Sequence, residues 1–368
     1  MASVTSGPLV RPRHRALLMR LDGLLRELRT DPTVRRRLIA EAPLVLAERG
    51  FASDTIPARL PPARPGDLLL THGQLFGLSP AAPLAEPPLE LRLLAYGLKP
   101  VVLLHGQDDE LRATLAWAEA RGFTALLSAH EWDRGVDEGK GGYSNLATNL
   151  RRARGGASAW RSLLVGADED ATALAWLALA LGWDELLGRL LGYPVCCTKS
   201  FPRRWAQAVA SHQGDLVAAC IDDSGPGPHD WRVNNLGRYF GAELIQHFPC
   251  RFGCTASRDL AALAEAALAA SEPDHQASVR TVLEAPVLYA EAEGVAVLPG
   301  AEVEAGDAAW HLRYDPAKVL VSLADGALHQ ALRAASTLTA RSGEREVEIG
   351  GHTLAARLVW FHEPAATA

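Results

Sequence analysis

The chain contains five cysteines, and all of them fall within one stretch of 59 residues. Cys196 and Cys197 are adjacent, Cys250 and Cys254 form a second pair, and Cys220 stands between the pairs. Thiolates are the side chains that bind soft metals and attack electrophiles. This clustering marks the middle of the chain as the region where chemistry is expected.

Each cysteine pair follows an aromatic residue and a proline, in Gly192-Tyr-Pro-Val-Cys-Cys197 and in His247-Phe-Pro-Cys-Arg-Phe-Gly-Cys254. Proline fixes φ and stiffens the approach to the thiols. The i, i+4 spacing of the second pair places both sulfurs on one side of a helical turn, whereas the adjacent pair can join them only where the backbone is irregular. We expect these four thiols to converge. Cys220 follows an apolar run and is predicted to be a small buried hydrophobe.

Four thiolates form the ligand set of an iron–sulfur cluster or of a tetrahedral zinc site. The ordinary zinc pattern has two Cys-x-x-Cys knuckles, and neither pair has that spacing. The sequence therefore predicts an iron–sulfur cluster, with zinc as the alternative; the ligands are Cys196, Cys197, Cys250 and Cys254. A redox or nucleophilic dithiol and a set of inert buried cysteines are the other interpretations. A disulfide framework is disfavoured because cytosolic thiols are kept reduced.

Cationic side chains flank both cysteine pairs. Lys199 follows the first pair and Arg251 lies inside the second. Both are predicted to contact the cofactor, because cations lower thiol pKa values and offset the negative charge of a thiolate-bound metal. Arg203, Arg204 and Arg258 are further cations nearby. The alternative interpretation is that all five belong to a solvated surface.

Two other residues are catalytic candidates. His247 lies three residues before Cys250 and is interpreted as a proton donor to a substrate, a substitute ligand, or a core histidine bonded to a backbone carbonyl. Tyr193 is chosen because its hydroxyl is expected to point toward whatever the cysteine pair holds. Thr255 or Ser257 is expected to cap an apolar helix, which places Cys254 near the positive end of its dipole.

Several segments must position these residues. Leucines at helical spacing predict a helical pair over residues 14–49, and the prolines of 57–65 predict a linker. Strand, helix and strand patterns follow over 101–104, 109–121 and 125–127, and residues 171–181 read as a buried helix. Beyond residue 279 short strands are predicted at 286–290, 294–298, 309–313, 346–349 and 353–361, with Gly350-Gly351 as a hairpin turn.

These patterns predict an α/β fold, with α+β as the alternative. Four regions are expected: a basic helical arm at 1–62, an α/β region at 63–190, a cysteine-motif region at 191–275 and a mostly antiparallel β region at 276–368. The arm contains eleven arginines against six acidic residues, whereas the whole chain has a net charge of −6. Such an arm either folds back on its own domain or reaches nucleic acid, which therefore stays among the candidate partners.

No apolar stretch reaches the roughly 20 residues that a membrane span needs, and no secretory signal is recognisable, so no membrane partner and a cytoplasmic location are expected. The sequence leaves the oligomeric state open.

The two cysteine motifs, Gly192-Tyr-Pro-x-Cys-Cys197 with Phe201 and His247-x-Pro-Cys250-x-x-x-Cys254-x-x-Ser257, resemble the signature of a prokaryotic domain family of uncharacterised function. The resemblance covers roughly residues 190–260 and implies no known activity. A shorter segment, Leu28-Arg-Thr-Asp-Pro32 through Leu46-Ala-Glu-Arg-Gly50-Phe51, is similar to the leader region of nitrile hydratase-type precursors of peptide natural products. That second resemblance implies a link to ribosomal peptide modification.

Two classes of function follow. In the first, the protein is an iron–sulfur or thiolate-dependent enzyme that modifies a small molecule, a peptide or RNA. In the second, it is a zinc-stapled binding module for a peptide or protein partner, or a dithiol redox protein. The adjacent cysteine pair favours the enzyme, because structural zinc rarely needs one.

Overall fold

The computed structural model describes parts of 17–30 and then residues 31–51, 87–134, 147–152, 160–212, 214–225, 227–291, 294–306, 309–323, 326–341 and 345–362. The chain divides into two compact units. The first comprises residues 1–70, 80–134 and 147–193; the second comprises 71–79, 135–146 and 194–368. All five cysteines belong to the second unit. The predicted linker at 57–65 lies outside the described residues.

The first unit is built on a four-stranded sheet with the order β1-β4-β2-β3. Its elements are β1 (Val101–Gln107), α5 (Asp108–Ala120), β2 (Thr124–Arg134), β3 (Ala147–Arg152) and β4 (Trp160–Gly166). β1 and β2 each pair antiparallel with β4, which lies between them. They are therefore parallel to one another, and β1-α5-β2 is a split β-α-β unit. The expected strand-helix-strand order is present, with an additional strand inserted.

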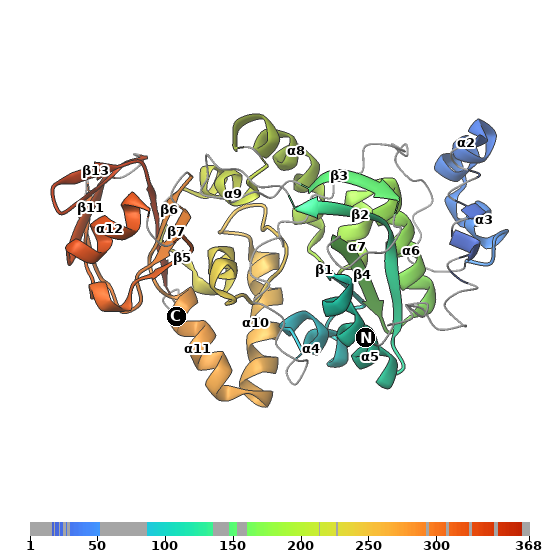
Figure 1. The fold of residues 1–368 in the computed structure, drawn as a ribbon, viewed down its shortest axis with the longest axis horizontal. Coiled ribbons are helices and arrows are strands. Elements are labelled where there is room, and N and C mark those ends of the chain that lie inside the picture. Colours follow the sequence, from blue (N-terminus) through green and yellow to red (C-terminus); the bar gives the residue numbers. More distant parts are fainter. Residues whose placement is uncertain are drawn as a thin grey trace, which may run out of the picture. The chain divides into compact units, whose positions relative to one another are not determined.

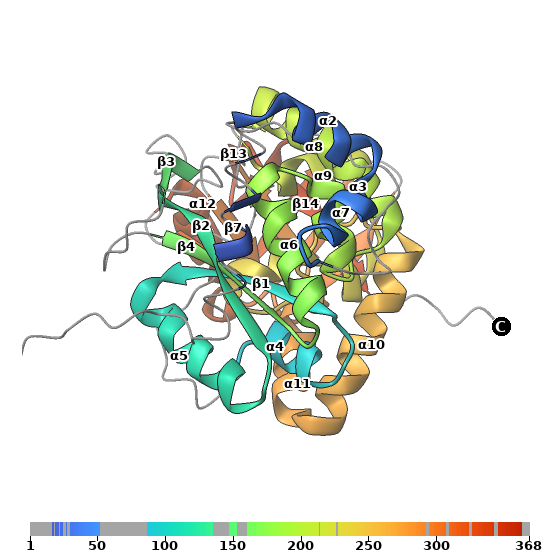
Figure 2. The same cartoon turned by 90° about the vertical axis from the view of Figure 1, so that its right-hand side faces the viewer.

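The two faces of this sheet pack against different helices, because successive residues of a strand point to opposite faces. Val102 and Val165 belong to the core formed with α5 and α4 (Leu89–Ala95), while Val101 and Leu164 belong to the core formed with α6 (Glu169–Leu181) and α7 (Asp184–Leu190). Figure 2 shows these helices around the sheet. α6 is buried on all sides from Ala171 to Leu181, as its uniformly apolar sequence predicts.

The N-terminal helical segment contributes to the same core. Its helices include α2 (Pro32–Ala40) and α3 (Ala42–Ala47), and Asp31 caps the first of them through the Thr33 N–H at 2.7 Å. Buried leucines of this segment, such as Leu21 and Leu38, belong to one hydrophobic cluster with α6 and α7. The helical part of the basic arm therefore packs within the first unit.

The second unit begins with four helices: α8 (Val195–His212), α9 (Leu216–Ser224), α10 (Thr255–Ser271) and α11 (Pro273–Leu283). α8 packs against α9, and α10 against α11 (Figure 1). Between α9 and α10 the chain forms β5 (His229–Asp230) and the short 3-10 helices η2 (Trp231–Val233) and η3 (Asn235–Phe240). Asp215 caps α9 by accepting the Val217 N–H at 2.9 Å.

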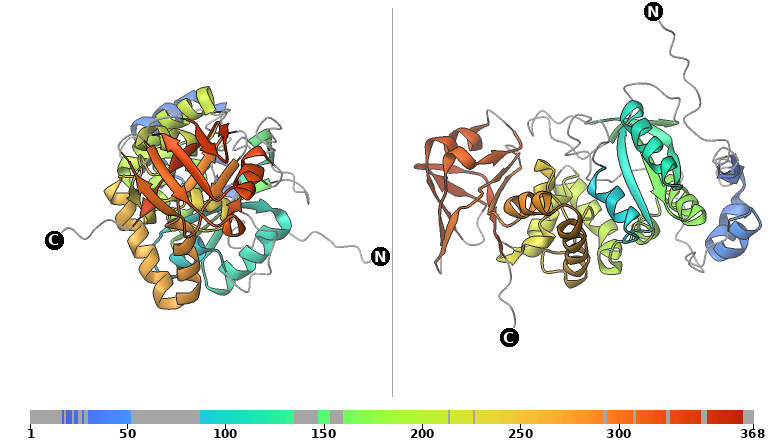
Figure 3. Two further views of the ribbon diagram at one scale, coloured as in Figure 1. Left: turned by 90° about the vertical axis from the view of Figure 1, so that its left-hand side faces the viewer. Right: turned by 90° about the horizontal axis from the view of Figure 1, so that it is seen from below.

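The C-terminal part of this unit is mostly antiparallel, and the expected α/β class with antiparallel C-terminal strands is confirmed. One sheet has the order β10-β7-β6-β14 and another the order β13-β12-β11-β9-β8, which Figure 3 shows face on. The strands are β6 (Val287–Ala290), β7 (Gly294–Val297), β8 (Glu302–Ala305), β9 (Ala309–Arg313), β10 (Leu320–Val321), β11 (Thr337–Arg341), β12 (Val347–Ile349), β13 (His352–Leu354), β14 (Arg357–Val359) and β15 (Phe361–His362), with η4 (Pro316–Lys318) and α12 (Ala327–Ala334) between them.

The hairpin between β12 and β13 turns at Gly350 and Gly351, as predicted, and both have positive φ (57° and 83°). The strand expected over 353–361 is instead divided among β13, β14 and β15. The reason is a change of partner, because β13 pairs with β12, β14 with β6, and β15 with β5.

β15 returns the chain to the cysteine region. It pairs in parallel with β5, where Phe361 lies opposite His229. The Phe361 ring packs edge-on against Phe252, with centroids 5.1 Å apart, and His229 lies 5.2 Å from the same ring. Phe252 stands between Cys250 and Cys254, so this aromatic group supports the loop that carries the second cysteine pair.

Candidate metal centre

Four thiols meet at one point of the second unit. The sulfurs of Cys196, Cys197, Cys250 and Cys254 all lie within 4.8 Å of one another. Cys254 Sγ is 3.6 Å from Cys196 Sγ and 3.7 Å from Cys197 Sγ, and the adjacent pair is 3.8 Å apart. The convergence expected from the sequence is present, and Cys220 is outside the group.

The local backbone that achieves this differs from the expectation. The irregular backbone expected at the adjacent cysteines is not present, because Cys196 and Cys197 lie in the first turn of helix α8. Both sulfurs still reach Cys254 from this helical turn. The segment from Cys250 to Cys254 is a tight turn closed by the Cys254 N–H donating to the Arg251 carbonyl at 3.0 Å. A helical turn was expected there, but the prolyl approach and Gly253 favour a loop.

The sequence predicts Thr255 or Ser257 as the N-cap of α10, and the structure differs. Thr255 is already helical, and the N-cap residue is Cys254 itself. Ser257, in the first turn, instead directs its hydroxyl to the thiols, 3.2 Å from Cys197 Sγ. The expectation that Cys254 lies at a helix N-terminus is correct. Two long helices, α8 and α10, therefore direct their N-termini, with partial positive charge, at the same four sulfurs.

The environment separates the thiols in acidity. Burial raises the pKa of Cys254, but hydrogen bonds from the hydroxyl and N–H of Ser257 and from the neighbouring thiols outweigh burial and lower it to about 7. Burial and then the charge of Cys254 raise the pKa of Cys250 to about 11. Burial also raises the pKa of Cys197, although Ser257 and the Cys250 N–H oppose it. Without a bound cation, one of the four thiols loses its proton easily, and the pKa values of Cys197 and Cys250 are raised. A bound metal ion would stabilise the negative charge of all four thiolates.

His247 reaches the site through Ser257. Its ring is buried, and its Nε2 lies 2.8 Å from Ser257 Oγ, which in turn lies 3.2 Å from Cys197 Sγ. The Cys250 N–H donates to the same sulfur at 3.3 Å. This chain matches the arrangement in which second-layer groups orient and tune a metal ligand. Sequence reasoning missed Ser257 as a thiol contact, although its position three residues after Cys254 is part of the motif.

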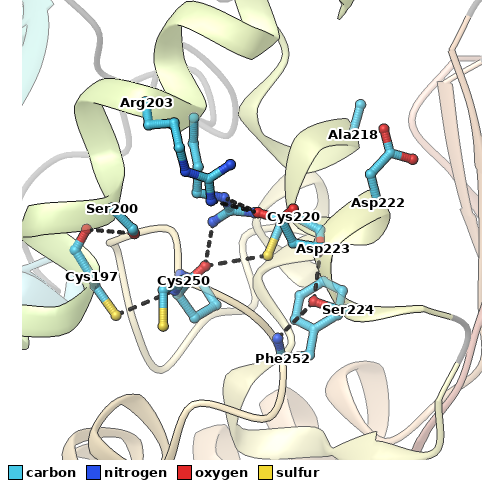
Figure 4. A network of polar contacts seen from close by, with 12 residues as sticks. Cys197, Ser200, Arg203, Ala218, Cys220, Asp222, Asp223, Ser224, Cys250 and Phe252 are labelled. Carbon is cyan, nitrogen blue, oxygen red and sulfur yellow. Dashed lines mark hydrogen bonds and ion pairs between the residues drawn. The ribbon is translucent and has the colours of Figure 1, made fainter.

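A buried guanidinium holds the second cysteine loop. Arg204 lies two helical turns after Cys197 on α8, with 1% of its side chain exposed. It donates to the Pro249 carbonyl at 2.5 Å and to Asp223 of α9 at 2.9 Å. Cys220 makes a longer contact to the same carbonyl, at 3.4 Å. Figure 4 shows this network beside Cys197 and Cys250. Arg204 thus ties α8, α9 and the loop together.

The other predicted site residues differ in their exposure and in their recorded contacts. The side chains of Lys199 and Arg251 are exposed, and within the described part of the chain neither has a hydrogen bond or ion pair to a thiol. The Tyr193 ring lies 5.0 Å from the ammonium of Lys99, which is buried in an ion pair with Glu90 inside the first unit. Arg258 is exposed beside Asp259.

The fold and site define a two-unit, mixed α/β protein with four thiols placed to hold a metal ion. Comparison with protein-family models, with curated proteins and with solved structures found no match. Among the helices of the described residues, none combines the length and apolarity required to cross a membrane.

Proposed function

We propose that the protein is a metal-thiolate protein whose four cysteines bind one tetrahedral ion, with zinc as the best fit, and that this ion fixes the helical core of the second unit. One observation carries the proposal: the sulfur–sulfur distances of 3.6, 3.7 and 3.8 Å. Zinc–sulfur bonds of about 2.3 Å in a regular tetrahedron separate neighbouring sulfurs by about 3.8 Å.

The same distances disfavour the iron–sulfur cluster expected from the sequence. In a four-iron cluster each cysteine binds a different iron and points outward, so the cluster itself spreads the sulfurs. Sulfurs bound to one shared ion lie closer together. Four sulfurs within 4.8 Å of one another support the single ion over the cubane, whose ligand sulfurs are spread farther apart.

The donor set supports a role in stabilising the fold. Four thiolates fill tetrahedral coordination, which is typical of zinc sites that hold protein segments together. Here the ligands join the start of α8 to the loop before α10, two segments more than 50 residues apart in the chain. The helix N-termini and the donors to Cys197 offset the negative charge that four thiolates retain around a divalent ion.

Membership of the uncharacterised prokaryotic domain family is part of the proposal. Its support is that residues of both motifs meet at one site: Cys196 and Cys197 from the first, and His247, Cys254 and Ser257 from the second. A signature that marks a metal site should bring its two halves together in this way.

The test is the metal content of protein purified without oxygen. We expect colourless protein with one zinc per chain, and cobalt substitution should give the visible absorption of a tetrahedral thiolate site. Cys220→Ala is the control and should bind the same amount, because Cys220 is outside the ligand group. Brown protein that contains several irons and acid-labile sulfide would show a cluster and contradict the single zinc ion. Metal-free, well-folded protein would overturn the whole proposal.

A further inference from the structure

We infer that Cys196 is the nucleophilic thiolate of this centre, that it reacts with a peroxide, and that Cys254 completes a disulfide that releases the metal. The inference rests on the proposed metal-thiolate function and adds a reactive site to it. The nucleophile, its partner and the order of events follow from differences among the four sulfurs.

Exposure distinguishes Cys196. It is exposed to solvent, whereas Cys197 and Cys254 are 3% and 5% exposed and Cys250 is half-buried. Oxidation of cysteine follows thiolate character and accessibility. A metal ion keeps all four sulfurs as thiolates, so accessibility then decides which one a dissolved oxidant meets first.

Hydrogen bonding points to the same residue. Cys197 Sγ accepts from the Cys250 N–H and lies against the Ser257 hydroxyl, and such donors draw charge from a thiolate. Within the part of the chain that the structure describes, the polar contacts of Cys196 Sγ are to thiols, at 3.6 and 3.8 Å. No backbone N–H or protein hydroxyl of the described residues draws charge from Cys196 as these groups do from Cys197, which leaves Cys196 the more nucleophilic sulfur.

Cys254 is the geometrically suitable partner. Its sulfur lies 3.6 Å from that of Cys196, closer than Cys197 Sγ at 3.8 Å, and it comes from a different segment of the chain. The adjacent Cys197 is less suitable, because neighbouring Cα atoms are about 3.8 Å apart and disulfides usually require about 4.4–6.8 Å. A disulfide with Cys254 is therefore favoured.

The reaction balances with hydrogen peroxide as the oxidant. The Cys196 thiolate attacks one peroxide oxygen, the O–O bond breaks, and hydroxide leaves and takes up a proton to form water, which leaves a sulfenic acid. The Cys254 thiolate then attacks that sulfur, the S–O bond breaks, and a second water forms. Two thiolates lose two electrons and the peroxide gains them. The disulfide would remove two of the four thiolate ligands, and Cys197 and Cys250 alone would hold the ion too weakly to retain it.

The test uses the full, metal-loaded chain. Metal content is measured first, so that protein without metal refutes the proposed function and not this inference. One equivalent of hydrogen peroxide is then added, zinc release is followed with a chromophoric chelator, and disulfides are mapped by mass spectrometry. We expect zinc to appear together with a Cys196–Cys254 disulfide. Zinc retained at tenfold excess, or a first oxidation product without Cys196, overturns the inference.

A matched pair of variants separates reactivity from ligation. Cys196→Ser and Cys250→Ser each remove one thiolate from the same site, so both should weaken metal binding. Only Cys196→Ser should slow peroxide-driven zinc release, by at least tenfold, since Cys250 is not the nucleophile. Equal slowing in both variants would show that the loss of any ligand slows zinc release, and this would contradict a special reactivity of Cys196. If neither variant retains zinc, the disulfide mapped in the unmodified protein decides the matter.

Discussion

Replacing Arg204 with Met tests the network behind the metal centre. Arg204 and Arg203 are consecutive, and both contact Asp223, at 2.9 and 3.5 Å. Their side chains are 1% and 66% exposed. Arg203→Met is therefore a control: it also removes one positive charge that pairs with Asp223, but from an exposed side chain. Only Arg204 also holds the carbonyl of Pro249, the residue before Cys250.

The expected magnitude follows from burial. Removing one partner of a fully buried ion pair destabilises a protein by about 3–5 kcal/mol. Asp223 is 26% exposed, so water can solvate part of its charge, and we expect Arg204→Met to lower the free energy of unfolding by about 3 kcal/mol. Arg203→Met should change it by less than about 1 kcal/mol. Because the Pro249 carbonyl positions Cys250, zinc affinity should fall about 10- to 100-fold in the Arg204 variant alone.

Two measurements check this prediction. Urea unfolding at a fixed, buffered zinc concentration gives the difference in stability between the variants, and competition with a chromophoric chelator gives zinc affinity. Equal losses in both variants would refute the argument from burial. Wild-type zinc affinity in a destabilised Arg204→Met protein would refute the link from the Pro249 carbonyl to the metal site.

Three further predictions concern the site and the first unit. Cys197→Ala should reduce bound metal sharply because it removes a ligand, whereas Arg251→Leu should change zinc affinity less than about threefold because an exposed cation is screened by solvent; metal analysis and chelator competition check both. Chelation of the metal should increase hydrogen exchange at the start of α8 and in the 249–254 loop while β1 and β4 keep their protection, and an equal increase in β1 and β4 would contradict a local role for the metal. Lys99→Met removes the ammonium from a buried ion pair with Glu90 and should destabilise the first unit by about 3 kcal/mol, measured by urea unfolding, with unchanged metal content.

Part of the site and of the fold could be predicted from residue types and local patterns. The convergence of Cys196, Cys197, Cys250 and Cys254 followed from residue type and clustering, and the buried helix at 171–181 from its uniform apolarity. The helix depends on residues that are close in the chain, whereas the meeting of two cysteine segments more than 50 residues apart was inferred from the ligand chemistry that the four thiols share.

Other features depend on packing and could not be predicted. Arg203 and Arg204 look alike in sequence, yet one turns to solvent and the other is buried, because successive helical residues point about 100° apart and α9 covers only one of those directions. The insertion of β4 between β1 and β2 leaves no local trace, since each strand carries the same apolar pattern whichever neighbour it pairs with. The spacing rule for zinc knuckles describes one loop shape, so it could not predict how close the four sulfurs lie to one another.

The pairing of β15 with β5 has a consequence for the order of events during synthesis. All four thiol ligands have been made once Cys254 is added, but Phe361, which packs on Phe252 in the ligand loop, follows about a hundred residues later. At about 5–20 residues per second, translation leaves a window of roughly 5–20 s in which the thiols exist without that support. If the nascent chain binds its ion in this window, the 250–254 loop is ordered before β15 pairs with β5. Without the ion, the loop is still mobile when β15 is made. Zinc supply during translation, and not only in the finished protein, would then govern the yield of folded chains.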